Sequence, residues 1–394
     1  MSAAAGCQDG PETRTFTILL IGDLMIGRLI DALLPTSIAR EQPESCPEDA
    51  AQKVDEYILP RNPQLNSYHY LSPWGNAVDL IRSSDGVIVN LETALTTTTT
   101  PWPGKVFNYR SHPGNVRCLQ ELGLGDGSHR ASVSLANNHT LDWCREGLLD
   151  TVQALHDAGV GFAGAGRTVE EAAQPGIVKL GKGSWTVKCW SFSDHPTDWR
   201  GEECFNLIDY TGTSREFMER QIKADDEIER YRHEGRSALK LVSMHWGPNY
   251  RWQPSQEIVA TAHWLIDACD VDIVHGHSSH HIQGVEVYKG RLIVYGCGDF
   301  VDDYAVDPNW RNDLSAAWRV TVAEVADRLA VKTLEGFPNR IQNFQAHLLN
   351  ARDDDHKWVG TKFRDLCATF HTVVDDELGP ESQLVVAMEK QRRA

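Results

Sequence analysis

Two histidines separated by one residue, His275 and His277, have the clearest potential for chemistry in this sequence. They follow a short apolar run, residues 271–274, whose length is typical of a buried strand. In extended backbone just past a strand end, residues two apart point to the same side, so both imidazoles can converge. Two neutral imidazoles from one loop supply half of a typical metal site. The alternative is a polar loop that is rich in histidine by chance.

Four further predicted strands end in residues that can also ligate a metal. These residues are Asp23, Glu92, Asn138 with His139, and His245. Ligands of open α/β sheets bind at the carboxyl ends of the strands. Mixed carboxylate, amide and imidazole ligands suit a divalent ion such as Mn, Fe or Zn. Two ions that share a carboxylate can activate water and stabilise a displaced oxygen, so we predict a site for up to two ions.

The elements that must position these residues alternate between strands and helices. Short apolar or alternating runs predict strands at residues 16–21, 86–90, 131–135, 184–192, 239–244 and 292–295. Helical spacing predicts helices at residues 48–58, 74–82, 145–158, 214–232 and 256–268. The tail carries predicted strands at residues 317–322, 329–334 and 341–348 and a helix at residues 358–370. Because no linker-like break occurs, we predict one α/β domain over residues 15–380, with flexible ends at residues 1–14 and 381–394.

Composition limits the partners and the compartment. The chain has 394 residues, of which 41% are hydrophobic and 24% are charged, as in an ordinary globular protein. Its net charge of −17 argues against nucleic acid or an anionic membrane as a partner. Nine cysteines without a Cys-x-x-Cys pair favour a reducing compartment. No signal peptide or membrane-spanning run is visible, so we expect a cytoplasmic protein without a membrane anchor.

Five motifs, taken in order, resemble the CapA family of capsule-synthesis proteins. They are Gly22-Asp23-Leu-Met-Ile-Gly-Arg28, Asn90-Leu-Glu92, Ala136-Asn-Asn-His139, His245-Trp-Gly and His275-Gly-His277. That family is linked to poly-γ-glutamate and is similar to the calcineurin-like metallophosphoesterases. The resemblance covers roughly residues 16–303. It implies a four-layer αββα sandwich with a two-metal site at the strand ends.

The resemblance also implies two sets of metal ligands. Asp23 and His277 would hold the first metal, and Glu92 would bridge the two. The second metal would be held by Asn138, His245 and His275. Several positions depart from the pattern. Metallophosphoesterases carry a histidine ligand two residues after the first aspartate, where Met25 stands in this chain, and their bridging aspartate is here the longer Glu92. Asn249 stands where the CapA pattern commonly has an acid, and Asp299 where it commonly has asparagine.

Roles in catalysis and substrate binding follow from the same resemblance. His139 would sit beside the substrate as a cation or general acid, oriented by Asp142 three residues on. Substrate contacts would come from Arg28, Arg110, Asn249 and Tyr250.

Three functions of different classes remain compatible with the sequence. The first is a metal-dependent hydrolase of a phosphoester or of an amide such as a γ-glutamyl bond. The second is a non-catalytic component of poly-γ-glutamate synthesis or export. The third is a metal-stabilised binding module for an anionic polymer. The positioned pair of His139 and Asp142 favours the hydrolase, because a binding module needs no acid. The expected substrate is an anionic small molecule or a peptide of the polyglutamate type.

Overall fold

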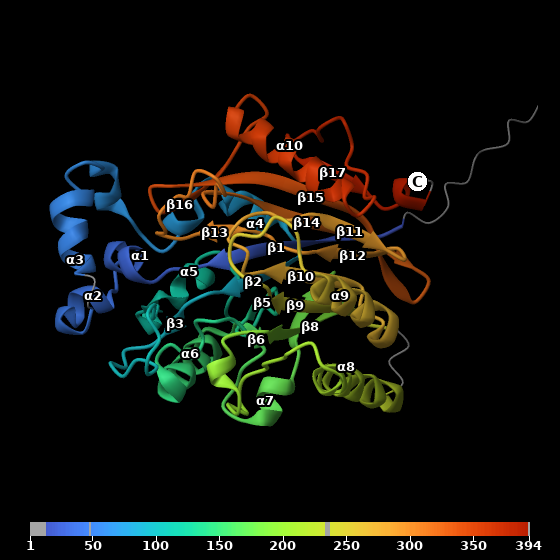
Figure 1. Ribbon diagram of the computed structural model, residues 1–394, viewed down its shortest axis with the longest axis horizontal. Helices are drawn as coiled ribbons and strands as arrows, with labels where there is room; N and C mark the ends of the chain where they lie inside the picture. The colour runs from blue at the N-terminus through green and yellow to red at the C-terminus, as the bar shows by residue number, and fades with distance from the viewer. Residues whose placement is uncertain (1–12, 47–48, 233–236, 393–394) are drawn as a thin grey trace, which may run out of the picture.

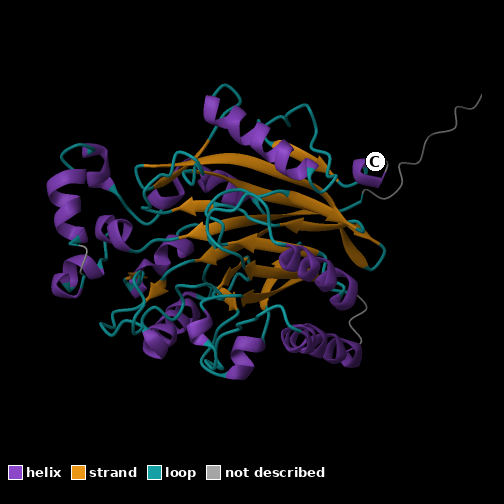
Figure 2. Ribbon diagram, in the orientation of Figure 1, coloured by secondary structure: helices purple, strands orange, loops and turns teal. Residues whose placement is uncertain are grey.

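Two β-sheets lie face to face, and helices cover the outer face of each in this computed structural model (Figure 1 and Figure 2). The structure describes residues 13–46, 49–232 and 237–392, so most of the predicted flexible N-terminus, residues 1–14, lies outside the described residues. The arrangement is a four-layer αββα sandwich. It confirms the fold class expected from the sequence.

The larger sheet joins a parallel half to an antiparallel half. On one side of β1 (Thr15–Leu24) lie the parallel strands β2 (Gly86–Leu91), β5 (Ala131–Ser134) and β6 (Gly161–Ala163). On the other side lie the antiparallel strands β14 (Leu314–Val325), β15 (Arg328–Gln342) and β16 (Gln345–Leu348). Two short strands join this path, β13 (Asp299–Val301) beside β1 and β17 (Leu384–Ala387) beside β15.

The smaller sheet has parallel inner strands and an antiparallel strand at each edge. Its order is β11 (Val285–Tyr288), β12 (Arg291–Val294), β10 (Ile273–His277), β9 (Leu239–His245), β8 (Trp185–Ser193) and β7 (Gly176–Leu180). A separate two-stranded ladder joins β3 (Ala94–Leu95) to β4 (Arg110–Ser111).

Alternating side chains of β1 show how the layers are held together. Ile18 and Leu20 pack between the two sheets, whereas Leu19 and Ile21 face the helices outside the larger sheet. Because all four are fully buried, each contributes about 1.5–3 kcal/mol relative to an exposed side chain. A central strand with apolar residues on both faces is expected where helices and a second sheet cover it.

The helices occupy different places around the two sheets. Those over the larger sheet are α4 (Val78–Ser83), α5 (Arg117–Gln120) and α6 (Cys144–Ala158). Those over the smaller sheet are α8 (Gly212–Arg232) and α9 (Gln256–Cys269). Helix α10 (Asp354–Ala368) packs against the core between the sheets, and α7 (Val169–Ala173) lies between β6 and β7 in the chain. Helices α1 (Arg28–Leu33), α2 (Ile38–Glu41) and α3 (Ala50–Lys53) gather at one end of the molecule (Figure 1).

A close approach at Gly22 shapes the carboxyl end of β1. The register between β1 and β2 shifts between Ile21 and Asp23, and the register with β13 shifts after Asp23. A Cβ at Gly22 would lie 1.9 Å from the Gly298 carbonyl oxygen, so only glycine allows β13 to come this close. Irregularities of this kind redirect side chains at strand ends. Here the irregularity places Asp23 in register with Asp299 on β13.

Three tail and helix predictions differ from the structure. Residues 341–348 do not form one strand, because β15 ends at Gln342 and the chain turns through Asn343 and Phe344, whose φ values are 52° and 61°. Residues 384–387, placed in a flexible tail from the sequence, form β17 and pair with β15. The helix predicted at residues 74–82 starts as a 3₁₀ segment, Ser72–Ala77, with a kink at Gly75, and becomes α-helical only in α4.

Candidate metal centre

Two groups of buried acidic and imidazole side chains meet at the carboxyl ends of the central strands. One group contains Asp23, His245 and His277, and the other contains Asp23, Glu92, His280 and Asp299. Within each group, one potential ligand atom per residue lies within 4.8 Å of the others. Asp23 belongs to both groups, whereas the sequence resemblance gave the shared position to Glu92. The structure therefore brings together four of the six predicted ligands through β1, β2, β9 and β10.

His277 is oriented by a chain of hydrogen bonds inside the smaller sheet. Ser243 Oγ lies 2.9 Å from His277 Nε2 and 3.0 Å from His275 Nδ1. If Nε2–H of His277 donates to Ser243, the serine hydroxyl donates onward to His275. Nδ1 of His277 is then left unprotonated as a ligand atom. His275 is in neither ligand group.

An imidazole reaches the second group from a position that the sequence reasoning did not use. Nδ1 of His280 lies 2.9 Å from Asp299 Oδ1, and both side chains are buried. The loop that carries His280 is sharply bent, with φ values of 95° at Ser278 and 62° at His280. Met25 supplies no ligand here, because its sulfur accepts a hydrogen bond from Gly27 N–H at 3.2 Å. His280 thus brings a further imidazole to this group from a distant loop.

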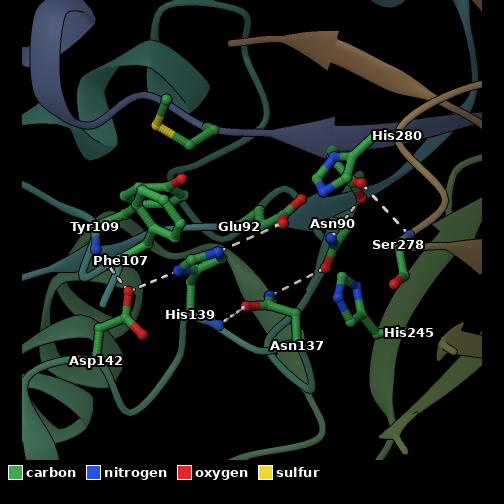
Figure 3. Close-up of polar contacts among 12 residues, drawn as sticks. Asn90, Glu92, Phe107, Tyr109, Asn137, His139, Asp142, His245, Ser278 and His280 are labelled. Carbon is green, nitrogen blue, oxygen red and sulfur yellow. Dashed lines mark hydrogen bonds and ion pairs between the residues drawn. The ribbon is translucent and has the colours of Figure 1, made fainter. Parts of the chain in front are cut away.

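Two predicted ligands carry buried oxygen atoms without hydrogen-bond partners. Among the described residues, no donor forms a hydrogen bond with either carboxylate oxygen of Glu92 or with Oδ1 of Asn138. The side chain of Asn137, next to Asn138 in the chain, has hydrogen-bond partners. It donates to Asn90 Oδ1 and Leu91 O. Its Oδ1 accepts from the His139 N–H (Figure 3). Buried oxygens of this kind are costly unless a cation or donor faces them. This difference identifies Asn138 as the amide that is free to ligate.

Burial and mutual repulsion shift the pKa of the acidic groups upward. Burial, and then the charge of Asp23, raise the pKa of Glu92 well above its usual range. The pKa of Asp299 rises for the same main reason, with Asp302 as the strongest neighbouring charge. Burial raises the pKa of Asp302 to about 7. Burial also lowers the pKa of His245, which keeps its imidazole neutral and able to ligate. The cluster is therefore a buried acidic site, in which Lys105 offsets part of the upward shift at Glu92.

His139 is held at the edge of this cluster by Asp142. Nδ1 of His139 lies 2.6 Å from Asp142 Oδ2, and Nε2 lies 3.8 Å from Glu92 Oε1 (Figure 3). Asp142 also accepts from the Tyr109 N–H at 2.5 Å and from Lys105. The ring of Tyr109 stacks on the imidazole with 4.0 Å between centroids. These contacts fix Nδ1 against Asp142 and turn Nε2 toward the metal-ligand groups.

A pocket of about 530 Å³, termed here the site pocket, opens beside these groups. Asn138, His139 and His280 line its inner end. Among the predicted substrate-binding residues, Arg28, Asn249 and Tyr250 line the same pocket. Arg110 does not, because it lines a neighbouring cavity. The exposed side chains of Val106 and Phe107 form part of the wall.

The sequence matches a known family model over most of its length. Residues 17–304 match the model of the bacterial capsule synthesis protein PGA_cap. The chain belongs to the PGA_cap family. This confirms the family resemblance that the motifs at the strand ends indicated.

Curated relatives of this PGA_cap chain come from several bacteria. A probable polyglutamine synthesis accessory protein of Mycobacterium tuberculosis is 33% identical over 364 residues, which cover 87% of this chain and 89% of the relative. The capsule biosynthesis protein CapA of Bacillus anthracis is 30% identical over 192 residues, which cover 48% and 42% of the two chains. Among solved structures, TT1561 of Thermus thermophilus covers 77% of this chain and 94% of its own, with 12% identity. Its TM-score is 0.35.

Three features of the PGA_cap site were not predicted as ligands or positioning groups. Asp299 follows a strand and a glycine, as Asp23 does, and that pattern could have identified it. His280 lies in the His-rich stretch, but its direction depends on a bent loop. Ser243 carries no sequence signal, because it is a small residue inside a buried strand. In the described part of the chain, no helix is both long and apolar enough to span a bilayer.

Proposed function

We propose that this chain is a metal-dependent hydrolase that cleaves a phosphoester or an amide bond of the γ-glutamyl type. The observation that carries the proposal is the environment of Glu92, which is fully buried and whose two carboxylate oxygens accept no hydrogen bond from the part of the chain that the structure describes. A carboxylate buried in this way is stable as an anion only beside a cation. Asn138 lines the site pocket, and its buried Oδ1 likewise has no hydrogen-bond donor among the described residues, so a cation could satisfy it too. The residues therefore fit one or two divalent ions.

The two ligand groups give each ion a defined set of donors. We assign Asp23, His245 and His277 to one ion, and Asp23, Glu92, His280 and Asp299 to the other. Asn138 is a further oxygen donor, and His275 acts through Ser243 on His277. Nitrogen and oxygen donors in this mixture suit Mn, Fe or Zn. A bound ion of this kind polarises a substrate oxygen and lowers the pKa of water.

The chain's own residues would bind the substrate and move its proton. Arg28 and Lys105 line the site pocket and attract an anionic group, although the whole chain carries a net charge of −17. His139 is held at Nδ1 by Asp142, so Nε2 is the atom that exchanges a proton with the substrate. Asn249 and Tyr250 complete the wall of the pocket and would orient the substrate.

A second candidate function is favoured by the names of the relatives. The Mycobacterium tuberculosis relative is described as a probable polyglutamine synthesis accessory protein. A non-catalytic component of poly-γ-glutamate synthesis or export would bind an anionic polymer without cleaving it. The pair of His139 and Asp142 favours the hydrolase, because polymer binding alone requires no proton-transfer group.

The test combines metal reconstitution with a substrate screen. The chelated protein is reloaded with Mn, Fe or Zn in turn and assayed against phosphoesters and γ-glutamyl amides. We expect hydrolysis of one class that depends on the added ion and is lost in His139→Ala. Full metal loading without hydrolysis of either class, combined with binding of poly-γ-glutamate, would replace the hydrolase with the accessory function.

A further inference from the structure

A second cavity adjoins the site pocket beneath the helical group α1–α3. This cavity, termed here the side pocket, has a volume of about 190 Å³. It shares the wall residues Arg28 and Val106 with the site pocket. The remaining wall comes from helices α1–α3, Ser45 and Cys46, the loop before β4, Arg110 of β4, and Trp143. A ligand that passes Arg28 can therefore extend from the metal-ligand groups into the side pocket.

Arg110 lines the side pocket as a buried cation without an anionic partner. Its guanidinium donates to Thr98 O and to Ser45 O and Oγ, which are neutral acceptors. It also lies over the Trp143 ring at 4.0 Å. Arg110 is only 5% exposed, and the described part of the chain places no carboxylate in an ion pair with it. A buried charge of this kind favours an anion from outside the fold.

Asp31 is the carboxylate among the described residues of the wall, and its hydrogen bonds go to groups other than Arg110. Asp31 accepts hydrogen bonds at Oδ1 from Ser111, the His112 N–H and Asn115. At Oδ2 it accepts from Ser37 and from the Ala39 N–H. Asp31 thus has its hydrogen-bonding capacity filled by the protein. The Nε–H of Arg110 has no acceptor among the described residues, so this edge of the guanidinium is left for a ligand.

Asn108 adds an acceptor to the same wall. Its Nδ2 donates to Lys105 O at 2.9 Å, which fixes the orientation of the amide. Its Oδ1 is buried and has no hydrogen-bond partner in the described part of the chain. An N–H group of a ligand would satisfy this atom. Ile38 and Pro101 give the pocket an apolar surface as well.

We propose that the side pocket is a subsite for one acidic unit of an extended, amide-linked substrate. The carboxylate of that unit pairs with Arg110, its amide N–H donates to Asn108 Oδ1, and its methylene groups lie against the apolar wall. Complete ligand pockets usually enclose about 300–1,000 Å³, so a cavity of 190 Å³ suits one unit of a longer chain. This inference rests on the proposed function and narrows its substrate class to acidic oligomers.

The test measures binding without turnover. The full chain is chelated, and isothermal titration compares glutamate, a γ-linked glutamate pentamer and inorganic phosphate. We expect the pentamer to bind at least about tenfold more tightly than glutamate, the factor that corresponds to one additional charged hydrogen bond. Arg110→Gln should abolish this gain, whereas Arg352→Gln, which removes an exposed arginine elsewhere, should leave it unchanged.

A second variant covers the case in which Arg110→Gln fails to fold, as judged by circular dichroism. Asn108→Asp preserves the side-chain shape and adds a negative charge, so it should also abolish the gain. Equal binding of glutamate and pentamer, or a gain that survives both substitutions, would overturn the subsite. Phosphate that binds as tightly as the pentamer and depends on Arg110 would overturn the amide-linked ligand. The titration is done without metal ions, so its outcome does not depend on whether the protein is a hydrolase. If the protein hydrolyses a substrate but does not bind the pentamer more tightly than glutamate, only the proposed subsite is rejected.

Discussion

The Nδ1 atoms of His245 and His277 lie 2.8 Å apart on two adjacent parallel strands. Both imidazoles are buried, and burial lowers the pKa of each well below the usual value, so two neutral rings face each other. A neutral imidazole carries one N–H, so in the metal-free protein one Nδ1–H can donate to the other Nδ1. With Asp23 4.0 Å from His277 Nδ1, the same three side chains form a set that could hold a divalent metal ion.

The positions of His275 and His277 predict unequal effects on metal affinity. His277→Ala removes a direct ligand and should raise the metal dissociation constant by more than about 100-fold. His275→Ala acts only through Ser243, and loss of such an outer partner typically costs about 10–100-fold. Titration of Mn or Zn into the chelated variants measures both. His371→Ala, at an exposed histidine, is the control. A larger effect of His275→Ala than of His277→Ala would contradict this order and restore His275 as a direct ligand.

His139 should affect turnover far more than metal content. A positioned proton-transfer group contributes about 10²–10⁴-fold to rate, so His139→Ala should lose that factor in kcat while elemental analysis finds the ions retained. Asp142→Asn keeps the imidazole but weakens its orientation, and a smaller loss is expected. If His139→Ala instead lost the ions, the division of roles between Asn138 and His139 would be wrong.

Metal uptake should release protons, and the number released should fall as pH rises. The pKa values of Glu92 and Asp299 are raised, and that of Asp302 is about 7, so these groups hold protons near neutrality in the metal-free protein. An ion must displace those protons, and affinity therefore increases as pH rises through about 7. Calorimetry in two buffers of different ionisation enthalpy, at about pH 6 and about pH 8, counts them. Asp302→Asn should reduce the release, whereas equal release at both pH values would contradict the prediction.

Gly22 should be essential for the geometry of Asp23. In Gly22→Ala the added Cβ would lie 1.9 Å from Gly298 O, so β1 and β13 must separate. We expect a loss of unfolding free energy of about 1–3 kcal/mol, the usual cost of overpacking, together with weaker metal binding. Urea unfolding measures the first effect. Gly212→Ala, where a Cβ meets nothing within 4 Å, should cost little by comparison. Equal stability of the two variants would show that the strands tolerate separation.

The sequence predicted those site residues that follow directly from strand ends. Asp23, Glu92, His245 and His277 each end or follow a buried strand, and the parallel registers bring those ends to one edge. The alternation of His275 and His277 was also correct, since both lie on the same face of β10. This spacing could not predict which of the two imidazoles reaches the ligand groups, because that depends on how the two sheets pack together.

The rest of the site depends on long-range geometry. His280 is turned toward Asp299 by backbone with positive φ at Ser278 and His280, which nothing in those residue types requires. Arg110 was expected among the substrate contacts, and its position in β4 places it in the side pocket rather than in the site pocket. β17 was missed because a four-residue strand near the chain end has too short a pattern to identify without its partner, β15.

The most direct test of the metal centre is the number of ions bound by the wild-type protein and by Asp23→Asn. Asp23 is the residue shared by both ligand groups, so its amide variant weakens both, whereas Glu92→Gln weakens only one. After chelation and reloading with Mn, Fe or Zn, elemental analysis should find up to two ions per chain in the wild type, fewer in Glu92→Gln, and almost none in Asp23→Asn. A wild type that takes up no transition metal and gains no thermal stability from it, or an Asp23→Asn variant that loads like the wild type, would contradict the proposed centre.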